Sequence, residues 1–188
     1  MLKYIEEAGK YLEITGFRNL CIEDTEDFVK VARKGVPQSI WVQFFNAELV
    51  ASWQHLYFAV LNALLAFKNE SNISKSVAME AMLYASAQRQ IRKAIALMGV
   101  KCSSANVALV VIGESAESVE SVLSAVSKRV GEETDDAVLE LSKEKVQAIR
   151  QAFGITKTEL ETVTEKDNDK DALVNLIIER VALLSTQL

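Results

Sequence analysis

The residues best suited to bind another molecule lie in the stretch ASAQRQIRKAI, which runs from Ala85 to Ile95. This stretch brings Arg89, Arg92 and Lys93 together, beside small and amide side chains. Guanidinium and ammonium groups bind phosphates, guanidinium planes also stack on bases, and a glutamine can hydrogen-bond to a base edge. The stretch therefore indicates a surface that could hold single-stranded nucleic acid.

The charge around this stretch differs from that of the whole chain. The 188 residues carry a formal net charge of −5, yet six basic and only two acidic residues lie between Lys68 and Lys101. Screening confines electrostatic interactions to about 10 Å at moderate salt. A local excess of positive charge can therefore attract an anionic partner although the chain as a whole is acidic.

Helical spacing predicts how these side chains are arranged. If residues 74–98 form one helix that ends at Gly99, successive side chains are about 100° apart, and a narrow stripe of the helix carries both cations and small residues. The residues of this stripe are Lys75, Met82, Ala85, Ser86, Arg89 and Lys93, with Gln90 and Arg92 beside them. The opposite, core-facing side would carry Leu83, Ala87, Ile91, Ala94, Ile95 and Met98. A solvated face without any partner is the alternative reading of such a stripe.

Other constellations that could do chemistry are missing from the sequence. It contains no GxxxxGK[ST], GxGxxG or HExxH motif, so phosphate-loop, dinucleotide and zinc-protease chemistry lack their parts. Ser115 follows a predicted strand, but Glu117 stands where a nucleophile elbow needs glycine, so Ser115 is read as a helix cap. His55 lies in the apolar run WQHLYF, which favours a core imidazole. We expect no enzyme activity, no metal and no cofactor.

Composition narrows the class of protein further. Cys21 and Cys102 stand alone, which favours reduced, buried thiols over a disulfide framework or a metal site. The acidic cluster at Glu132, Glu133, Asp135 and Asp136 lacks the spacing of a calcium loop and is read as a solvated turn. The start of the chain does not resemble a signal peptide, and no apolar run reaches roughly twenty residues. A cytoplasmic protein without membrane contact is expected.

Apolar periodicity and chain breakers predict a mixed α/β fold, in which a small sheet of about four strands is packed by several helices. We expect residues 1–188 to form a single domain, because no linker or repeat interrupts the pattern. The predicted strands are Lys10–Leu20, Ser39–Ala47, Ala105–Gly113 and Ala137–Ser142. The predicted helices are Thr25–Gly35, Ala47–Phe67 with Asn46 as its cap, Ser74–Met98, Ser115–Val130, Lys143–Phe153, one opened by a Thr156–Glu159 capping box, and Ala172–Leu188 after a polar loop over residues 164–171.

The block SKSVAMEAMLYASAQRQIRKAIALMGVK, from Ser74 to Lys101, resembles the signature of the small KEOPS subunit family, whose animal member is the PRPK-binding protein TPRKB. The resemblance rests on Glu80, on MLYASAQRQI and on AIALMGVK, and it departs at Ala87, where a glycine is expected. It implies a TPRKB-like domain with a non-catalytic role in threonylcarbamoyladenosine (t6A) modification of tRNA. Such a subunit would hold the 3′ CCA tail of tRNA and dock on a small PRPK-like kinase or ATPase.

The resemblance also implies roles for the stripe. Its cations, Lys75, Arg89, Arg92 and Lys93, would meet phosphates. Gln90 and Ser86 would contact bases or sugars, and Met82 with Ala85 would form the floor of the groove. Two alternatives stay open: a structural adaptor or kinase regulator whose basic helix contacts an acidic protein surface without RNA, and an enzyme whose site the motifs do not reveal.

Overall fold

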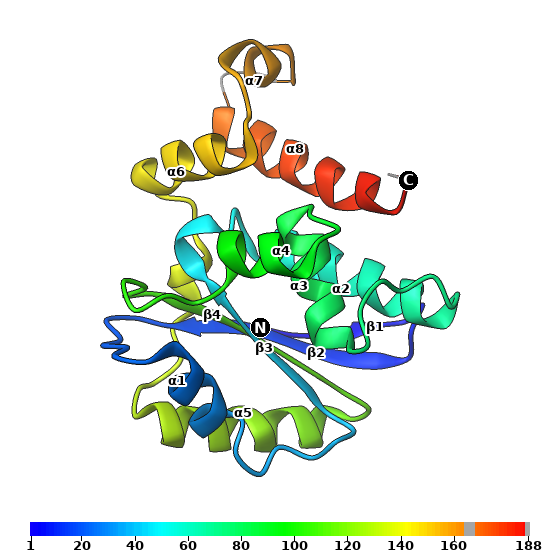
Figure 1. The fold of residues 1–188 in the computed structure, drawn as a ribbon, viewed down its shortest axis with the longest axis vertical. Coiled ribbons are helices and arrows are strands. Elements are labelled where there is room, and N and C mark those ends of the chain that lie inside the picture. The colour runs from blue at the N-terminus through cyan, green and yellow to red at the C-terminus, as the bar shows by residue number, and fades with distance from the viewer. Residues whose placement is uncertain (164–167, 187–188) are drawn as a thin grey trace.

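The computed structural model describes residues 1–163 and 168–186, and its centre is a four-stranded antiparallel sheet (Figure 1). The strands are β1 (Leu2–Ile5), β2 (Lys10–Phe17), β3 (Trp41–Asn46) and β4 (Val107–Gly113), in the spatial order β1-β2-β4-β3. In the register of the sheet, Phe17 of β2 and Asn46 of β3 both pair with Val107 of β4. Every residue of β4 is buried, which explains its uninterrupted apolar sequence VALVVIG.

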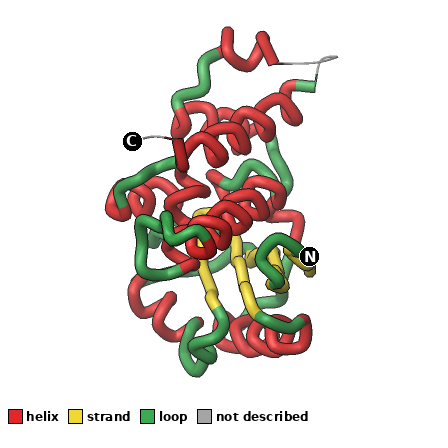
Figure 2. Tube along the Cα trace, turned by 90° about the vertical axis from the view of Figure 1, so that its right-hand side faces the viewer, coloured by secondary structure: helices red, strands yellow, loops and turns green. Residues whose placement is uncertain are grey.

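Helices cover both faces of this sheet (Figures 1 and 2). On one face lie α1 (Thr25–Ala32) and α5 (Ala116–Val130). On the other face lie α2 (Trp53–Lys68), α3 (Val77–Ser86) and α4 (Ile91–Met98), followed outward by α6 (Lys143–Phe153), α7 (Lys157–Val163) and α8 (Asp169–Leu183). Three short 3-10 turns complete the described elements: η1 (Ala47–Leu49), η2 (Asp136–Leu139) and η3 (Leu184–Thr186). A mixed α/β fold around a four-stranded sheet is therefore confirmed.

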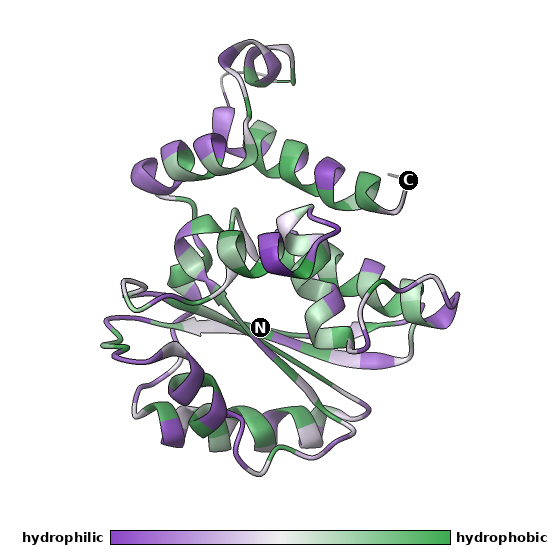
Figure 3. Ribbon diagram, viewed as in Figure 1, coloured by the Kyte–Doolittle hydropathy of each residue, from purple (hydrophilic) through white to green (hydrophobic). Residues whose placement is uncertain are grey.

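Alternation along β4 divides the core between the two faces. Val107, Leu109 and Val111 belong to the cluster under α1 and α5, whereas Val110 and Ile112 belong to the larger cluster under α2 and α3. This is the period of two expected for a strand that is buried on both sides. Figure 3 shows the matching hydropathy pattern, with hydrophobic residues along the central strands and hydrophilic residues alternating with hydrophobic ones on the helices.

The predicted strand at residues 137–142 is wrong, and the fourth strand is β1. Residues 136–139 instead form η2, whose cap Asp135 accepts a hydrogen bond from the amide of Ala137 at 2.8 Å. The tight turn lets the consecutive residues Val138 and Leu139 enter the same core cluster, whereas neighbouring side chains of a strand point to opposite faces of the sheet. β1 is a four-residue edge strand in which Ile5 is the buried residue, so its sequence shows little alternation.

The predicted helix at residues 47–67 begins later than expected. Asn46 caps only the turn η1, where its Oδ1 accepts from the amide of Glu48 at 3.3 Å. The chain is extended again at Val50, and α2 starts at Trp53 with Ser52 as its cap. Two cap residues six positions apart thus divide one apolar segment into a turn and a helix.

Several smaller predictions can also be compared with the structure. Ser115 caps α5, as predicted. The predicted Thr156–Glu159 capping box is also present, and its two reciprocal hydrogen bonds measure 3.3 and 3.1 Å. The expected burial of Cys21 and Cys102 is wrong, because both are free and exposed. Most of the predicted loop at 164–171 and the end of the last predicted helix, 187–188, lie outside the described residues. In the described part of the chain, no helix is long and apolar enough to cross a membrane.

Candidate nucleic-acid interface

The segment predicted as one long basic helix is two helices joined by a sharp turn. α3 ends at Ser86, Ala87 adopts a left-handed conformation with φ of 50°, and α4 begins at Ile91. The amide of Ala87 donates to the carbonyl of Tyr84 at 2.9 Å, and that of Gln88 donates to the carbonyl of Leu83 at 3.1 Å. These two bonds form a Schellman motif, which ends a helix. The continuous stripe predicted from helical spacing is therefore wrong.

A contact from another helix explains why the chain breaks here. In a continuous helix the carbonyl of Ala85 would accept from the amide four residues later, that of Arg89. Instead, Nε2 of His55 on α2 lies 2.8 Å from this carbonyl oxygen. The hydroxyl of Ser86 donates to the carbonyl of Leu83 at 3.0 Å, a local bond of the kind that competes with helix continuation. Both contacts favour termination of α3 at this point.

The predicted site residues differ in exposure, because α3 is almost entirely buried and the turn with the start of α4 is exposed. Arg89, Gln90, Arg92 and Lys93 are exposed around the junction of α3 and α4, and we call these four residues the basic corner. Lys75 is also exposed, but it lies in the loop before α3 rather than on a helix.

The remaining three predicted residues lie beneath the corner. Met82, Ala85 and Ser86 are buried, so the expectation that they share an exposed stripe is wrong. The expected core face fails in part as well, because Ile91 is 42% and Ile95 46% exposed, while Ala94 and Met98 are buried. The turn at Ala87 interrupts the helical phase, so the apolar face of α4 cannot be extrapolated from α3.

The start of α4 reinforces the positive charge of the basic corner. Its first turn contains no acidic residue, and the side chain of its cap, Gln90, makes no capping hydrogen bond. Arg92 and Lys93 stand in this turn, although the positive end of a helix dipole usually attracts carboxylates. Cations and a helix amino terminus together make a favourable place for an anion such as a phosphate.

His55 holds the corner against the core. Its Nδ1 accepts from the amide of Ala51 at 3.3 Å, so Nε2 carries the proton and donates to the carbonyl of Ala85. Burial lowers the pKa of His55 to about 4, and its ring packs edge-on against Phe153 of α6 at 5.9 Å. The predicted core imidazole is confirmed, and it connects α2, α3 and α6 beneath the basic corner.

A buried carboxylate holds the loop that carries Lys75. Glu80 is fully buried on α3, and its carboxylate accepts from the amides of Ile73 at 3.1 Å and Ser74 at 2.7 Å. Burial, with Glu80 nearby, raises the pKa of Tyr84 on the same helix. The glutamate that carries part of the sequence signature therefore fixes the backbone directly before Lys75.

A groove that no sequence motif indicated lies beside the corner, between α1, α3 and α4. It has a volume of about 550 Å³, and Met82 and Ile95 are among its lining residues. Arg33, at the end of α1, also lines it and donates from Nη2 to Oε1 of Gln43 on β3 at 2.6 Å. Arg33 and Gln43 lie far from the basic stretch in sequence, and no motif joins them to it.

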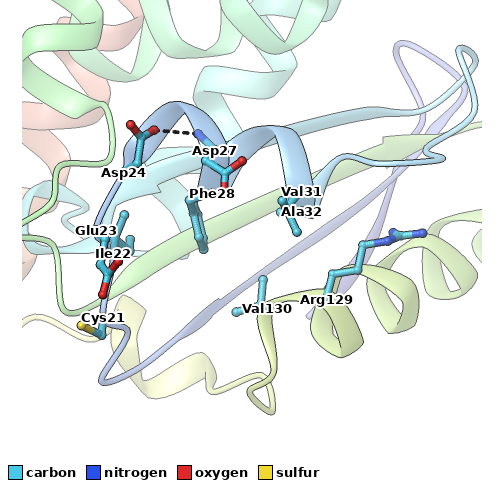
Figure 4. A pocket seen from close by; sticks show the side chains of 10 residues that line it. All are labelled: Cys21, Ile22, Glu23, Asp24, Asp27, Phe28, Val31, Ala32, Arg129 and Val130. Carbon is cyan, nitrogen blue, oxygen red and sulfur yellow. Dashed lines mark hydrogen bonds between the residues drawn. The ribbon is translucent and has the colours of Figure 1, made fainter.

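A smaller pocket of about 320 Å³ lies between α1 and α5 (Figure 4). Asp24 and Asp27 lie at one end, where Oδ1 of Asp24 accepts from the amide of Asp27 at 2.8 Å and caps α1. Arg129 lies at the other end, on α5. Asp24 already acts as a helix cap, and the charged lining of this pocket is three carboxylates with one guanidinium group, so it is no basic site like the corner. Among the described residues, no group of three or more histidine, cysteine, aspartate or glutamate side chains could hold a metal ion.

Comparisons with known proteins cover most of this chain. The family model described as kinase binding protein CGI-121 matches residues 24–185, which include the basic corner and the groove. A protein from Methanocaldococcus jannaschii, described as regulatory protein Cgi121, is 35% identical over 134 residues. That alignment spans 71% of this chain and 83% of the archaeal protein.

Proposed function

Because this chain belongs to the CGI-121 family of kinase-binding proteins, we propose that it is a cytoplasmic, non-catalytic, tRNA-binding subunit of a KEOPS complex. In this role it holds the 3′ CCA tail of tRNA during t6A modification and docks on a PRPK-like kinase or ATPase. The family itself supports a regulatory role with a kinase partner. The RNA-binding part of the proposal rests on the basic corner.

The observation that carries the RNA proposal is the exposed position of Arg89, Arg92 and Lys93 around one helix amino terminus. Three cations and a helix dipole at one turn suit consecutive phosphates of a flexible strand. A single-stranded tail fits this surface because its bases are already free to unstack, so no duplex has to be opened. Gln90, exposed between Arg89 and Ile91, is placed to contact a base or a sugar.

The other predicted residues act at the edges of this surface or below it. Lys75 adds a cation from a loop that Glu80 holds in place. Met82 contributes to the adjoining groove. Ala85 and Ser86 support the backbone of the turn from inside the core, rather than touching RNA directly.

We propose that the kinase binds an apolar helical surface and leaves the basic corner open. α2 carries the partly exposed aromatic residues Trp53, Tyr57 and Phe58, and Leu183 at the end of α8 is 46% exposed. Partly exposed apolar side chains of this kind can be buried against a partner. Tail capture and kinase docking can then occur on different parts of the molecule.

A structural adaptor without RNA binding is the second candidate function. The observation that favours it is the exposure of Ile91 and Ile95 next to the cations of α4, since mixed apolar and positive surfaces also bind acidic proteins. A binding assay with purified tRNA, intact and lacking its CCA end, separates the two functions. Tail capture requires weaker binding of the shortened tRNA, whereas equal binding of both would remove it.

A further inference from the structure

The groove between α1, α3 and α4 combines apolar walls with a floor from the sheet. Val29 of α1, Met79 and Met82 of α3 and Ile95 of α4 form apolar parts of its lining. Phe44 and Gln43 of β3 contribute the floor. Its volume of about 550 Å³ lies in the range of sites for small organic ligands.

Arg33 places an incompletely paired cation in this groove. Its Nε is buried and has no hydrogen-bond partner among the described residues, and no described ion pair involves its guanidinium group. Burial lowers the pKa of Arg33. Because Arg33 lines the groove and its positive charge has no carboxylate partner among the described ion pairs, the guanidinium group can attract an anionic ligand.

Gln43 holds Arg33 in its position. The Oε1 atom of Gln43 accepts from Arg33 and also from the amide of Phe44, at 3.1 Å. Its Nε2 donates to the carbonyl of Ala78 at 3.0 Å, which fixes the orientation of the amide group. The guanidinium group also lies 6.0 Å from the ring of Phe44. These contacts restrict the guanidinium group before any ligand arrives.

The groove adjoins the basic corner through α4. Helical spacing places Ile91 and Arg92 within about 60° of Ile95 around the helix axis, whereas Lys93 points about 160° away. Ile95 lines the groove, so Arg92 belongs to the groove side of α4 and Lys93 to the outer side. Lys30 and Glu26 of α1 line the groove as well, so its charged lining is two cations, Arg33 and Lys30, and one carboxylate.

We propose that this groove binds a single nucleotide, with the base against Met79, Met82 and Ile95 and the phosphate near Arg33, Lys30 and Arg92. A lone phosphate would leave the apolar walls without a contact, and an apolar side chain would leave the charge of Arg33 without an anionic partner. A nucleotide satisfies both, because it joins a flat base to an anion. The ligand is either one nucleotide of the RNA tail held at the corner or a free mononucleotide. The first source rests on the proposed function, and the second does not.

The test compares wild-type protein with three variants. Arg33→Met removes the cation and keeps an extended side chain, and Ile95→Glu places a negative charge on an exposed wall where folding is little affected. Arg129→Met makes the same chemical change as Arg33→Met in the pocket between α1 and α5 and serves as the control. Circular dichroism and thermal unfolding report whether each variant folds.

Binding is measured by calorimetry with AMP, CMP and inorganic phosphate, and by fluorescence anisotropy with a labelled RNA that ends in CCA. We expect Arg33→Met and Ile95→Glu each to weaken RNA binding by at least about tenfold, while Arg129→Met has little effect. Measurable binding of AMP or CMP, lost in the same two variants, would identify free nucleotides as a second source. Should Arg33→Met not fold, Ile95→Glu alone decides the result.

Two outcomes overturn the proposal. One is equal RNA binding by wild type, Ile95→Glu and any folded Arg33→Met protein. The other is that inorganic phosphate competes with the labelled RNA as strongly as AMP does, since the apolar walls would then contribute nothing to nucleotide binding. The experiment distinguishes failure of the groove proposal from failure of the proposed function. If charge reversal of the basic corner abolishes RNA binding but both groove variants keep it, only nucleotide binding in the groove is refuted.

Discussion

The Nε2 atom of His55 lies 2.8 Å from the carbonyl oxygen of Ala85, thirty residues further along the chain. This bond occupies the carbonyl that a continuous helix would use for the amide of Arg89. The imidazole therefore takes part in ending α3 directly before the basic corner. A buried, neutral side chain on α2 thus helps to decide where the exposed cations lie.

The protonation of His55 should make stability depend on pH. Its pKa in the folded protein is about 4, below the value of 6.5 taken for the unfolded chain. Between these pH values the unfolded chain binds a proton that the folded protein does not. The contribution of the neutral His55 to stability is therefore complete above pH 6.5 and is lost as the pH falls toward 4. We expect this single group to lower the free energy of unfolding by up to roughly 3 kcal/mol.

Urea denaturation at a series of pH values measures this effect. His55→Gln is the matched variant, since an amide can also donate and accept but does not titrate. The difference in free energy of unfolding between wild type and His55→Gln should shrink from about pH 7 to about pH 5. An unchanged difference over this range would show that His55 does not titrate as the structure requires.

Replacing Ala87 by glycine should stabilise the protein. Ala87 has φ of 50°, a left-handed conformation in which a Cβ atom is unfavourable and glycine is not. We expect Ala87→Gly to raise the free energy of unfolding by about 1 kcal/mol, measured by urea denaturation. Ala81→Gly, at a buried position inside α3, is the contrasting variant and should destabilise the protein. Destabilisation by both changes would contradict the left-handed turn.

Reversal of Arg89, Arg92 and Lys93 to glutamate should abolish tRNA binding and leave the fold intact, because all three are exposed. The logarithm of RNA affinity should fall with the logarithm of salt concentration by roughly 0.7 for each contacted phosphate of a single strand. Single reversals should each flatten this slope by about one contact. Gln90→Ala should weaken discrimination between bases with little change in slope.

The control for this experiment reverses Lys34, Lys128 and Arg129, three exposed cations on the α1 and α5 side of the sheet. It changes the net charge equally. Lys145 is unsuitable for a control, because it is buried and its Nζ donates to the carbonyls of Val138 and Glu140. If the control set weakens RNA binding as much as the corner set, the corner is a solvated face.

The same corner variant tests the arrangement of the two partners. A PRPK-like kinase should bind wild type and the triple reversal with the same affinity, in a complex of about one to one with a negative heat-capacity change. Isothermal titration calorimetry at several temperatures measures both quantities. Loss of kinase binding in the corner variant would favour the adaptor function, in which the cations contact an acidic protein surface.

Local sequence patterns were sufficient for much of the fold. The buried run of β4, the helix cap at Ser115 and the helix from Lys143 to Phe153 were all predicted, because each depends on neighbours in the chain. β1 was missed, since a short edge strand buries a single residue and shows little periodicity. The turn η2 was mistaken for a strand because consecutive apolar residues alone do not distinguish the two.

By itself, the sequence determined that a cluster of cations lies near the middle of an otherwise acidic chain, and which residues compose it. The tertiary structure decided how these residues are presented. Contacts between residues far apart in sequence, His55 with Ala85 and Arg33 with Gln43, help to end α3 and place a guanidinium group in the groove. Helical periodicity holds only while the backbone bonds of a helix continue, so it could not foresee the exposure of Ile91 and Ile95 beyond the turn. It also could not foresee that the rest of the fold covers α3 on nearly all sides, which buries Met82, Ala85 and Ser86.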